Sequence, residues 1–169
     1  MRANRIGLPG LVLALAAVPA AADDPPDIDH QPSPCTVPSQ PVAVCASIFD
    51  DQAVSKARVY FRPQGERYFS YSEMVFSGLE YCATLPAPRE GKLESLEYYL
   101  QAADDAYQTR RSSTFQVAVL ETEACPFPPV ERDVARASSI TVYATHRKQG
   151  DKLDDKFVRE GVSFIARKD

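Results

Sequence analysis

The chain has 169 residues, of which 19 are basic and 23 acidic, and its formal net charge is -4. The acids are dispersed and no basic stripe interrupts them, so we expect neither a nucleic-acid partner nor attraction to an anionic membrane surface. The two histidines lack metal-binding spacing, and the sequence has no glycine-rich phosphate loop and no G-x-S-x-G motif. The sequence therefore predicts no catalytic residues, no resident metal and no cofactor.

Residues 1–22 are typical of a secretory signal peptide. Arg2 and Arg5 form a positive n-region, residues 11–18 form a short apolar stretch, and Ala20-Ala21-Ala22 is a small-residue cleavage site. The alternative is a membrane anchor, which the short apolar stretch disfavours. No later segment is apolar enough to span a membrane, so we expect a periplasmic or secreted protein with no membrane insertion after cleavage.

Residues 23–41 are rich in proline and acid and predict an extended N-terminal arm, stiffened by polyproline geometry. One cysteine, Cys35, lies inside this arm. A disulfide from Cys35 would hold the arm against the rest of the protein.

The four cysteines predict two disulfides, because their number is even and the chain is small and carries an export signal. A zinc site would need paired C-x-x-C spacing, which is absent. The spacing alone allows three pairings and does not choose among them. The residues concerned are Cys35, Cys45, Cys82 and Cys125.

From residue 42 the chain reads as short strands with alternating apolar residues, separated by turn residues. No segment is convincingly an amphipathic helix, although residues 93–106 could be misread as one. This pattern predicts an antiparallel β-sandwich over residues 42–120. The expected strands are 42–48, 56–62, a weaker one at 68–75, 79–85, 93–103 and 114–120.

Aromatic residues have to fill the centre of this sandwich, because the chain has no tryptophan. Tyrosines at alternating strand positions are most often core or half-buried residues. Any that face outward could instead stack on a sugar. The residues expected to fill the core are Tyr60, Phe61, Tyr81, Tyr98, Tyr99 and Phe115.

Residues 121–169 form a C-terminal extension that is too short for a domain of its own. Two further strands are expected, at 140–144 and 162–166, which either add to the sandwich edge or form a hairpin packed on it. The polar stretch between them carries Arg147, Lys148 and Lys152. This basic tip is either a solvated loop or a site for an anionic partner.

The order of these segments resembles that of bacterial extracellular immunoglobulin-like or fibronectin type III-like domains. The matching features are a strand ending in Tyr-Phe-Arg (57–62), the strand of Met74, Tyr-x-Ala-x-Leu-Pro (81–86) and Glu-Tyr-Tyr-x-x-x-Ala-Asp (97–104). The resemblance spans residues 42–120 and implies an all-β, immunoglobulin-like antiparallel sandwich. Domains of this kind serve as binding, spacer or assembly modules, so it implies little about activity.

The resemblance also implies one disulfide pairing. It makes residues 42–48 strand B and residues 79–85 strand E, which are antiparallel neighbours in that topology. Cys45 and Cys82 are both out of phase with the apolar residues of their strands, so both would lie on the outer face. This favours a Cys45–Cys82 bridge and leaves Cys35 to pair with Cys125.

The same topology brings two pairs of acids to one pole of the sandwich. Asp50-Asp51 would lie in the B–C loop and Asp104-Asp105 in the F–G loop. Four carboxylates at one pole could bind Ca²⁺. The alternative is that these aspartates end their strands by accepting hydrogen bonds from turn amides.

Three functional hypotheses follow. The first is an exported, non-catalytic interaction or accessory module that binds a protein through a sandwich edge or through this pole. The second is a carbohydrate-binding module, which the lack of tryptophan disfavours. The third is a hydrolase that would use two carboxylates facing each other across a cleft. We expect the first, and the sequence names neither the partner nor the oligomeric state.

Overall fold

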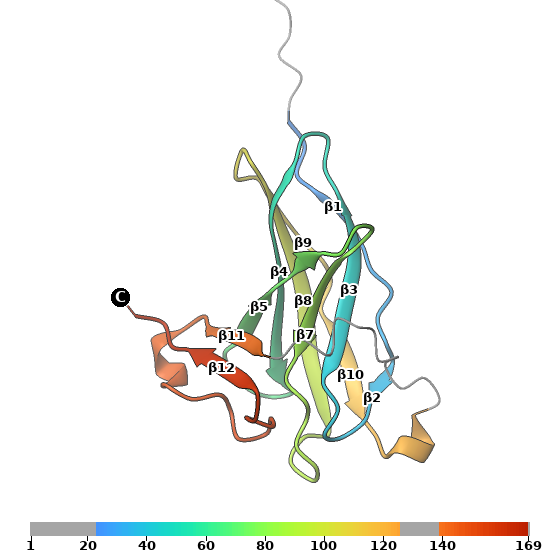
Figure 1. The fold of residues 1–169 in the computed structure, drawn as a ribbon, viewed down its shortest axis with the longest axis vertical. Helices are drawn as coiled ribbons and strands as arrows, with labels where there is room; N and C mark the ends of the chain where they lie inside the picture. The colour runs from blue at the N-terminus through green and yellow to red at the C-terminus, as the bar shows by residue number, and fades with distance from the viewer. Residues whose placement is uncertain (1–22, 126–138, 169) are drawn as a thin grey trace, which may run out of the picture.

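The computed structural model describes residues 23–125 and 139–168 and shows an all-β fold of two facing sheets (Figure 1). The predicted leader lies outside the described residues. The smaller sheet has the order β1-β3-β7-β6 and is antiparallel throughout. Its strands are β1 (Asp27–Asp29), β3 (Val42–Phe49), β7 (Tyr81–Leu85) and β6 (Val75–Phe76).

The larger sheet has the order β12-β11-β5-β4-β8-β10-β2, and a short strand, β9, pairs with β8 beside β10. Its members are β12 (Val162–Ile165), β11 (Ile140–Ala144), β5 (Ser70–Glu73), β4 (Val54–Pro63), β8 (Ser95–Asp104), β9 (Thr109–Arg111), β10 (Phe115–Val119) and β2 (Cys35–Thr36). Within the described ranges the helical pieces are two single 3₁₀ turns, η1 (Thr122–Ala124) and η3 (Arg147–Gln149), and no helix is long enough to cross a membrane.

The strands predicted for residues 42–120 are found, with one change at 68–75. This segment divides at Met74: β5 ends at Glu73 in the larger sheet, and β6 begins at Val75 in the smaller one. Met74 is buried, and its backbone N–H donates to the Ala57 carbonyl, so the crossing itself is fixed in the core. Leu79, expected to begin a strand, is 86% exposed in the turn before β7.

The proline-rich arm contributes strands to both sheets. β1 pairs antiparallel with β3 in the smaller sheet, and β2 pairs parallel with β10 in the larger one. The arm thereby covers one edge of each sheet, which leaves fewer unpaired backbone groups at those edges.

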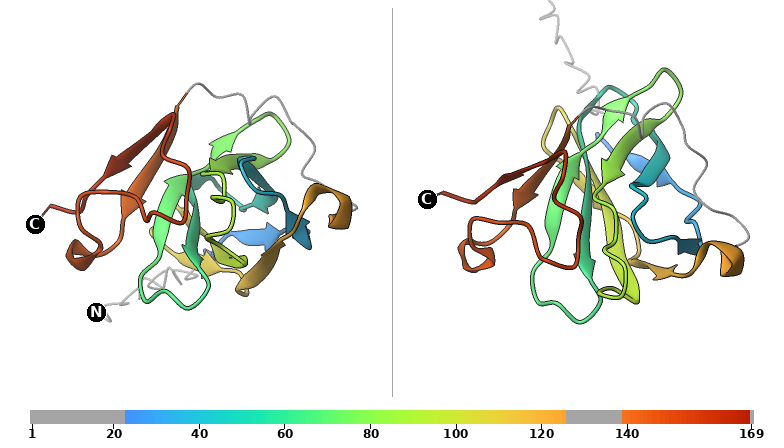
Figure 2. Two further views of the ribbon diagram at one scale, coloured as in Figure 1. Left: turned by 90° about the horizontal axis from the view of Figure 1, so that it is seen from below. Right: turned by 60° about the horizontal axis from the view of Figure 1, so that its bottom comes forward.

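The C-terminal strands extend the larger sheet. β11 pairs antiparallel with β5, and β12 runs parallel to β11, so the edge-addition alternative is confirmed and the hairpin is wrong. A hairpin requires antiparallel neighbours, whereas residues 145–161 here return the chain to the start of β11. Figure 2 shows β11 and β12, in orange and red, beside β5 at one side of the sandwich.

The core lies between the two sheets and follows the predicted alternation on β3, β4 and β8. Phe61 and Tyr98 are buried as expected, and Tyr81 and Phe115 pack against the core while partly exposed. Tyr60 and Tyr99 were expected in the core, and this prediction is wrong. Tyr60 comes directly before the buried Phe61, and Tyr99 comes directly after the buried Tyr98. Because successive side chains of a strand point to opposite faces, both tyrosines lie on the outer face of the larger sheet.

Both disulfides form with the pairing that the resemblance implied. Cys45 and Cys82 lie directly opposite each other on β3 and β7, and Cys35 is joined to Cys125 across 90 residues. The second bridge is buried with Val37 in a small satellite cluster of its own. Two disulfides favour an oxidising extracellular or periplasmic location.

Candidate functional site

Four tyrosines form a continuous ladder across the outer face of the larger sheet. The strand register places Tyr60 of β4 opposite Tyr99 of β8 and opposite Tyr71 of β5, and Tyr71 opposite Tyr143 of β11. Successive ring centroids are 4.7 Å apart for Tyr99–Tyr60, 5.4 Å for Tyr60–Tyr71 and 4.9 Å for Tyr71–Tyr143. Because directly opposite side chains are the closest neighbours in a sheet, the register alone accounts for this stacking.

The ladder presents ring edges to solvent. The Tyr60 and Tyr99 rings are inclined by only 5° at their 4.7 Å separation, so they stack face to face and cannot lie side by side in one plane. The Arg111 guanidinium lies 3.6 Å from the centre of the Tyr99 ring. Tyr60 has Tyr99 and Tyr71 as neighbours on its two sides. The large ring faces of Tyr60 and Tyr99 are therefore occupied by other side chains of the protein.

Two arginines flank the ladder tyrosine of β4. Arg58, Tyr60 and Arg62 share the outer face because they are two residues apart. Arg58 forms an ion pair with Glu73 at 3.3 Å, and Arg62 forms one with Glu97 at 2.6 Å. Both pairs are partly exposed, so each contributes little to stability and mainly fixes the position of its guanidinium.

The ladder forms the floor of an open groove of about 690 Å³ between β8 and the C-terminal strands. This is the size of a typical ligand site. The residues that line it include no aspartate and no glutamate, although the chain as a whole has a net charge of -4. Four cationic side chains line it: Arg58, Arg67, Arg167 and Lys168. We call this feature the arginine–tyrosine groove.

The hydroxyls of Tyr71 and Tyr99 in the groove remain protonated at neutral pH. Burial raises the pKa of Tyr71 and of Tyr99 above the ordinary value of 10.0, and this outweighs the opposing effect of the nearby Arg58 and Arg111 charges. These two residues therefore offer O–H groups, which can donate hydrogen bonds to a bound ligand.

The basic tip predicted from the sequence lies next to this groove. Lys148 and Lys152 line a smaller cavity of about 340 Å³ that shares Arg67 and Tyr68 with the groove. His146, which precedes the η3 turn, stacks on the Tyr68 ring with centroids 4.3 Å apart. The two cavities therefore meet at Arg67 and Tyr68.

The predicted acidic pole has the chemistry of turn caps. Val54 pairs with Asp104, so the β3–β4 and β8–β9 turns lie at the same end of the sandwich. Asp50 Oδ1 accepts from the backbone N–H groups of Gln52 (3.0 Å) and Ala53 (2.9 Å), and the buried Asp104 accepts from Gln108 N (2.7 Å). Aspartate at a strand end commonly accepts such hydrogen bonds from the backbone N–H groups of the residues that follow.

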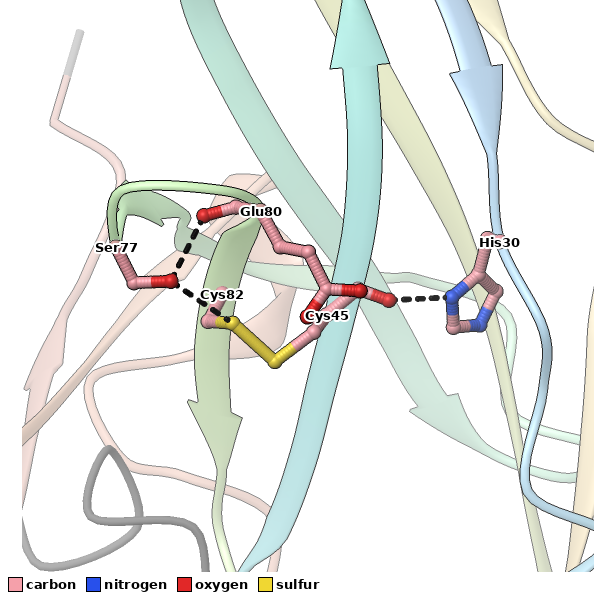
Figure 3. The surroundings of a disulfide bond; sticks show 5 residues. All are labelled: His30, Cys45, Ser77, Glu80 and Cys82. Carbon is pink, nitrogen blue, oxygen red and sulfur yellow. Dashed lines mark hydrogen bonds between the residues drawn. A yellow bond between two sulfur atoms is a disulfide. The ribbon is translucent and has the colours of Figure 1, made fainter.

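Among the described residues, no three carboxylates of this pole place oxygen atoms within 4.8 Å of one another. Asp51 and Asp105 are exposed. In residues 23–125 and 139–168, the group of three potential ligands with atoms within 4.8 Å of one another is Cys45, Glu80 and Cys82. These two cysteines are bonded to each other, as Figure 3 shows, so their sulfurs are not available as thiolate ligands.

His30 fastens the N-terminal arm to the sandwich. Its Nδ1 lies 2.7 Å from the Cys45 carbonyl oxygen, which can only accept, so Nδ1 carries the hydrogen (Figure 3). In the neutral ring, Nε2 then accepts from the Tyr98 hydroxyl at 2.6 Å. Burial lowers the pKa of His30 and outweighs the hydrogen bond to Cys45 and the charges of Asp29 and Glu80, which raise it.

This contact predicts a loss of stability on acidification. The unfolded chain binds a proton at His30 near pH 6.5, whereas the folded chain binds it only at lower pH. The contribution of His30 is therefore complete above pH 6.5 and is lost as the pH falls toward the lowered pKa. Urea unfolding between about pH 8 and about pH 5 should show this loss. His30→Gln should reduce the pH dependence, and an unchanged pH profile in that variant would contradict the assignment.

The groove was not predicted, although part of the sequence pattern that forms it can be recognised on one strand. Arg58, Tyr60 and Arg62 are out of phase with the apolar residues of the same strand, which places them on the outer face. Tyr60 was assigned to the core because tyrosine is largely hydrophobic, although its position in the alternation indicates the outer face. The contributions of Tyr71 and Tyr143 depend on strand register, which the sequence pattern does not give.

Comparison with known proteins adds little to this geometry. No protein-family model and no curated protein matches the chain. Two chains among the solved structures match, one of them in the crystal structure of an engineered protein from the Northeast Structural Genomics Consortium. That match has 19% identity and a TM-score of 0.41, and covers 57% of this chain but only 20% of the other. It assigns neither a family nor a function.

Proposed function

We propose that this chain is an exported, non-catalytic interaction module that binds a protein partner through the arginine–tyrosine groove. The observation that carries the proposal is the groove itself: an open hollow of about 690 Å³ on the larger sheet, half of whose lining residues are tyrosines and arginines. Tyrosine and arginine are among the residues that dominate binding energy at protein interfaces. Their mutual stacking here orders them before binding, which lowers the entropy cost of association.

The finer fold assignment is part of the proposal. The order β1-β3-β7-β6 opposite β5-β4-β8-β10 corresponds to strands ABED facing C′CFG of an immunoglobulin-like or fibronectin type III-like sandwich. In this assignment β2 is the first-strand segment that crosses to the other sheet, and β11 and β12 are an addition beyond C′. Sandwich modules of this kind carry varied binding sites on one scaffold.

Export is proposed from two features together. Residues 1–22 have the composition of a signal peptide, and the two disulfides are typical of proteins that mature in an oxidising compartment. Localisation is therefore periplasmic or secreted, where the partner is also expected.

The two alternative functions have less support from the groove. A sugar-binding platform needs open aromatic faces, whereas Tyr60 and Tyr99 turn their faces toward each other. A carboxylate-dependent glycoside hydrolase needs two acids about 5 to 9 Å apart across a cleft, and the groove lining contains none.

The experiment is a pull-down from the envelope fraction with the mature protein and two matched variants. Ala166→Trp places a large neutral side chain in the groove, and Ala53→Trp places the same side chain at the exposed acidic pole. We expect one protein to be retained in stoichiometric amount by the wild type and by Ala53→Trp, and lost with Ala166→Trp.

Three outcomes would overturn the proposal. Loss of the partner with Ala53→Trp but not with Ala166→Trp would move the contact to the pole. Retention on cell-wall glycan without any protein would favour the carbohydrate-binding alternative. Capture of nothing by the wild type would remove the interaction-module function.

A further inference from the structure

We infer that the arginine–tyrosine groove receives an extended, carboxylate-rich segment of the partner protein, an inference that rests on the function proposed above. The groove then recognises acidic side chains by charge and by hydrogen bonds, and it aligns the segment along the edge strand β12.

The charge of the groove is opposite to that of the whole molecule. The lining has four cationic side chains and no carboxylate, whereas the chain carries 23 acidic residues and 19 basic ones. One of the four, Arg58, is partly neutralised by Glu73 at 3.3 Å. Such separation concentrates positive potential in one concave place, which attracts anionic groups and steers their approach.

Two other cations of the groove, Arg167 and Arg67, contact neutral groups. Arg167 donates from one terminal nitrogen to the Thr145 carbonyl at 2.8 Å, and the Arg67 guanidinium lies 5.4 Å from the centre of the Tyr68 ring. A guanidinium held in this way keeps further N–H groups for a planar anion, and carboxylate is the anion whose geometry matches two of them at once.

The floor of the groove favours acceptors over stacking ligands. The hydroxyls of Tyr71 and Tyr99 can donate to carboxylate oxygens, while the ring faces of Tyr60 and Tyr99 are occupied by neighbouring tyrosines and by Arg111. Nucleic-acid bases and sugar rings gain much of their affinity by stacking on open aromatic faces, which Tyr60 and Tyr99 do not offer.

The border of the groove fits an extended peptide. β12 ends the larger sheet and, among the described residues, has β11 as its one strand neighbour. An extended segment can therefore pair with β12 as an added strand. Alternate side chains of that segment would point over the groove, where Arg167 and Lys168 follow the end of β12 and Ile165, 44% exposed, offers an apolar contact.

The test uses a short fluorescent peptide of alternating glutamate and threonine, with a glutamine–threonine peptide as its neutral match. Fluorescence anisotropy with the mature protein should show binding of the glutamate peptide only. Raising the ionic strength from about 0.01 M to about 1 M shortens the Debye length from about 30 Å to about 3 Å and should remove most of the binding.

Two double variants locate the charge. Arg167→Gln with Lys168→Gln removes two cations from the groove and should weaken binding of the glutamate peptide about tenfold. Arg89→Gln with Lys92→Gln makes the same change in net charge at exposed positions that line none of the cavities described above, and should leave binding unchanged. Melting temperatures of both variants report whether either change disturbs the fold.

Failure of this inference is distinguishable from failure of the proposed function. Equal binding of both peptides, or equal weakening by both double variants, would overturn the inference that the groove binds an acidic segment. So would tight binding of an oligouronate together with no binding of the glutamate peptide, which would assign an anionic glycan. A protein partner that is lost with Ala166→Trp but is insensitive to salt and to the groove double variant keeps the interaction module and removes only its preference for acid.

Discussion

Replacing Cys35 and Cys125 together by alanine should lower the free energy of unfolding by about 4 to 5 kcal/mol. The bridge closes a loop of 90 residues, so its loss frees most of the domain in the unfolded state. Both cysteines are buried, which is why alanine is preferred to serine for the replacement. The melting temperature should fall by roughly 10 to 20 °C, measured under oxidising conditions.

The matched control replaces Cys45 and Cys82 by alanine. In the chain-entropy model the contribution depends on the logarithm of loop length, so the 37-residue loop should be worth only about 0.8 kcal/mol less than the 90-residue one. A loss below about 1 kcal/mol for the first variant would contradict the prediction. A lower m-value would show that the arm has come away in the native state without general unfolding.

The disulfide pairing was predictable because it depends on quantities that the sequence carries. The phase of the apolar residues on β3 places Cys45 on the outer face, and the same phase on β7 places Cys82 there. The strand order, supplied by the family resemblance, then makes the two strands neighbours. The remaining pair follows by elimination, although the sequence does not show that β2 lies beside β10 in parallel.

The predicted acidic pole remains a prediction as a binding site. Asp50 and Asp104 stand at the ends of strands whose turns lie at the same end of the sandwich. The sequence pattern of an aspartate at a strand end is the same whether the side chain caps a turn or binds a cation. The difference lies in where the second carboxylate oxygen points, which a pattern of residue types does not encode.

The groove could not be predicted from the sequence for a different reason. Its ladder joins Tyr60, Tyr71, Tyr99 and Tyr143, whose alignment depends on three separate registers. A shift of one residue in any of them would turn that strand's tyrosine to the core. The parallel return of β12, which closes the groove on its far side, could not be foreseen from a segment read as a polar loop.

The same polar segment holds the second prediction of large effect. Phe157 lies between β11 and β12 in sequence, among charged residues, yet it is 1% exposed and packs edge-on against Phe61 with ring centroids 5.5 Å apart. Leu153 and Val142 join it in the main core cluster. We therefore expect Phe157→Ala to lower the free energy of unfolding by about 3 to 5 kcal/mol, because it leaves a cavity beside Phe61.

The control for this prediction is Phe49→Ala, the same change at a position that is 65% exposed at the end of β3. It should alter stability by no more than about 0.5 kcal/mol. If urea unfolding gives the two variants the same loss, the C-terminal extension lies on the sandwich without belonging to its core. If Phe157→Ala is far less stable and its transition stays single, the extension and the sandwich unfold together. The groove between them is then held by the same core that holds the two sheets, which gives its side chains the fixed positions that binding requires.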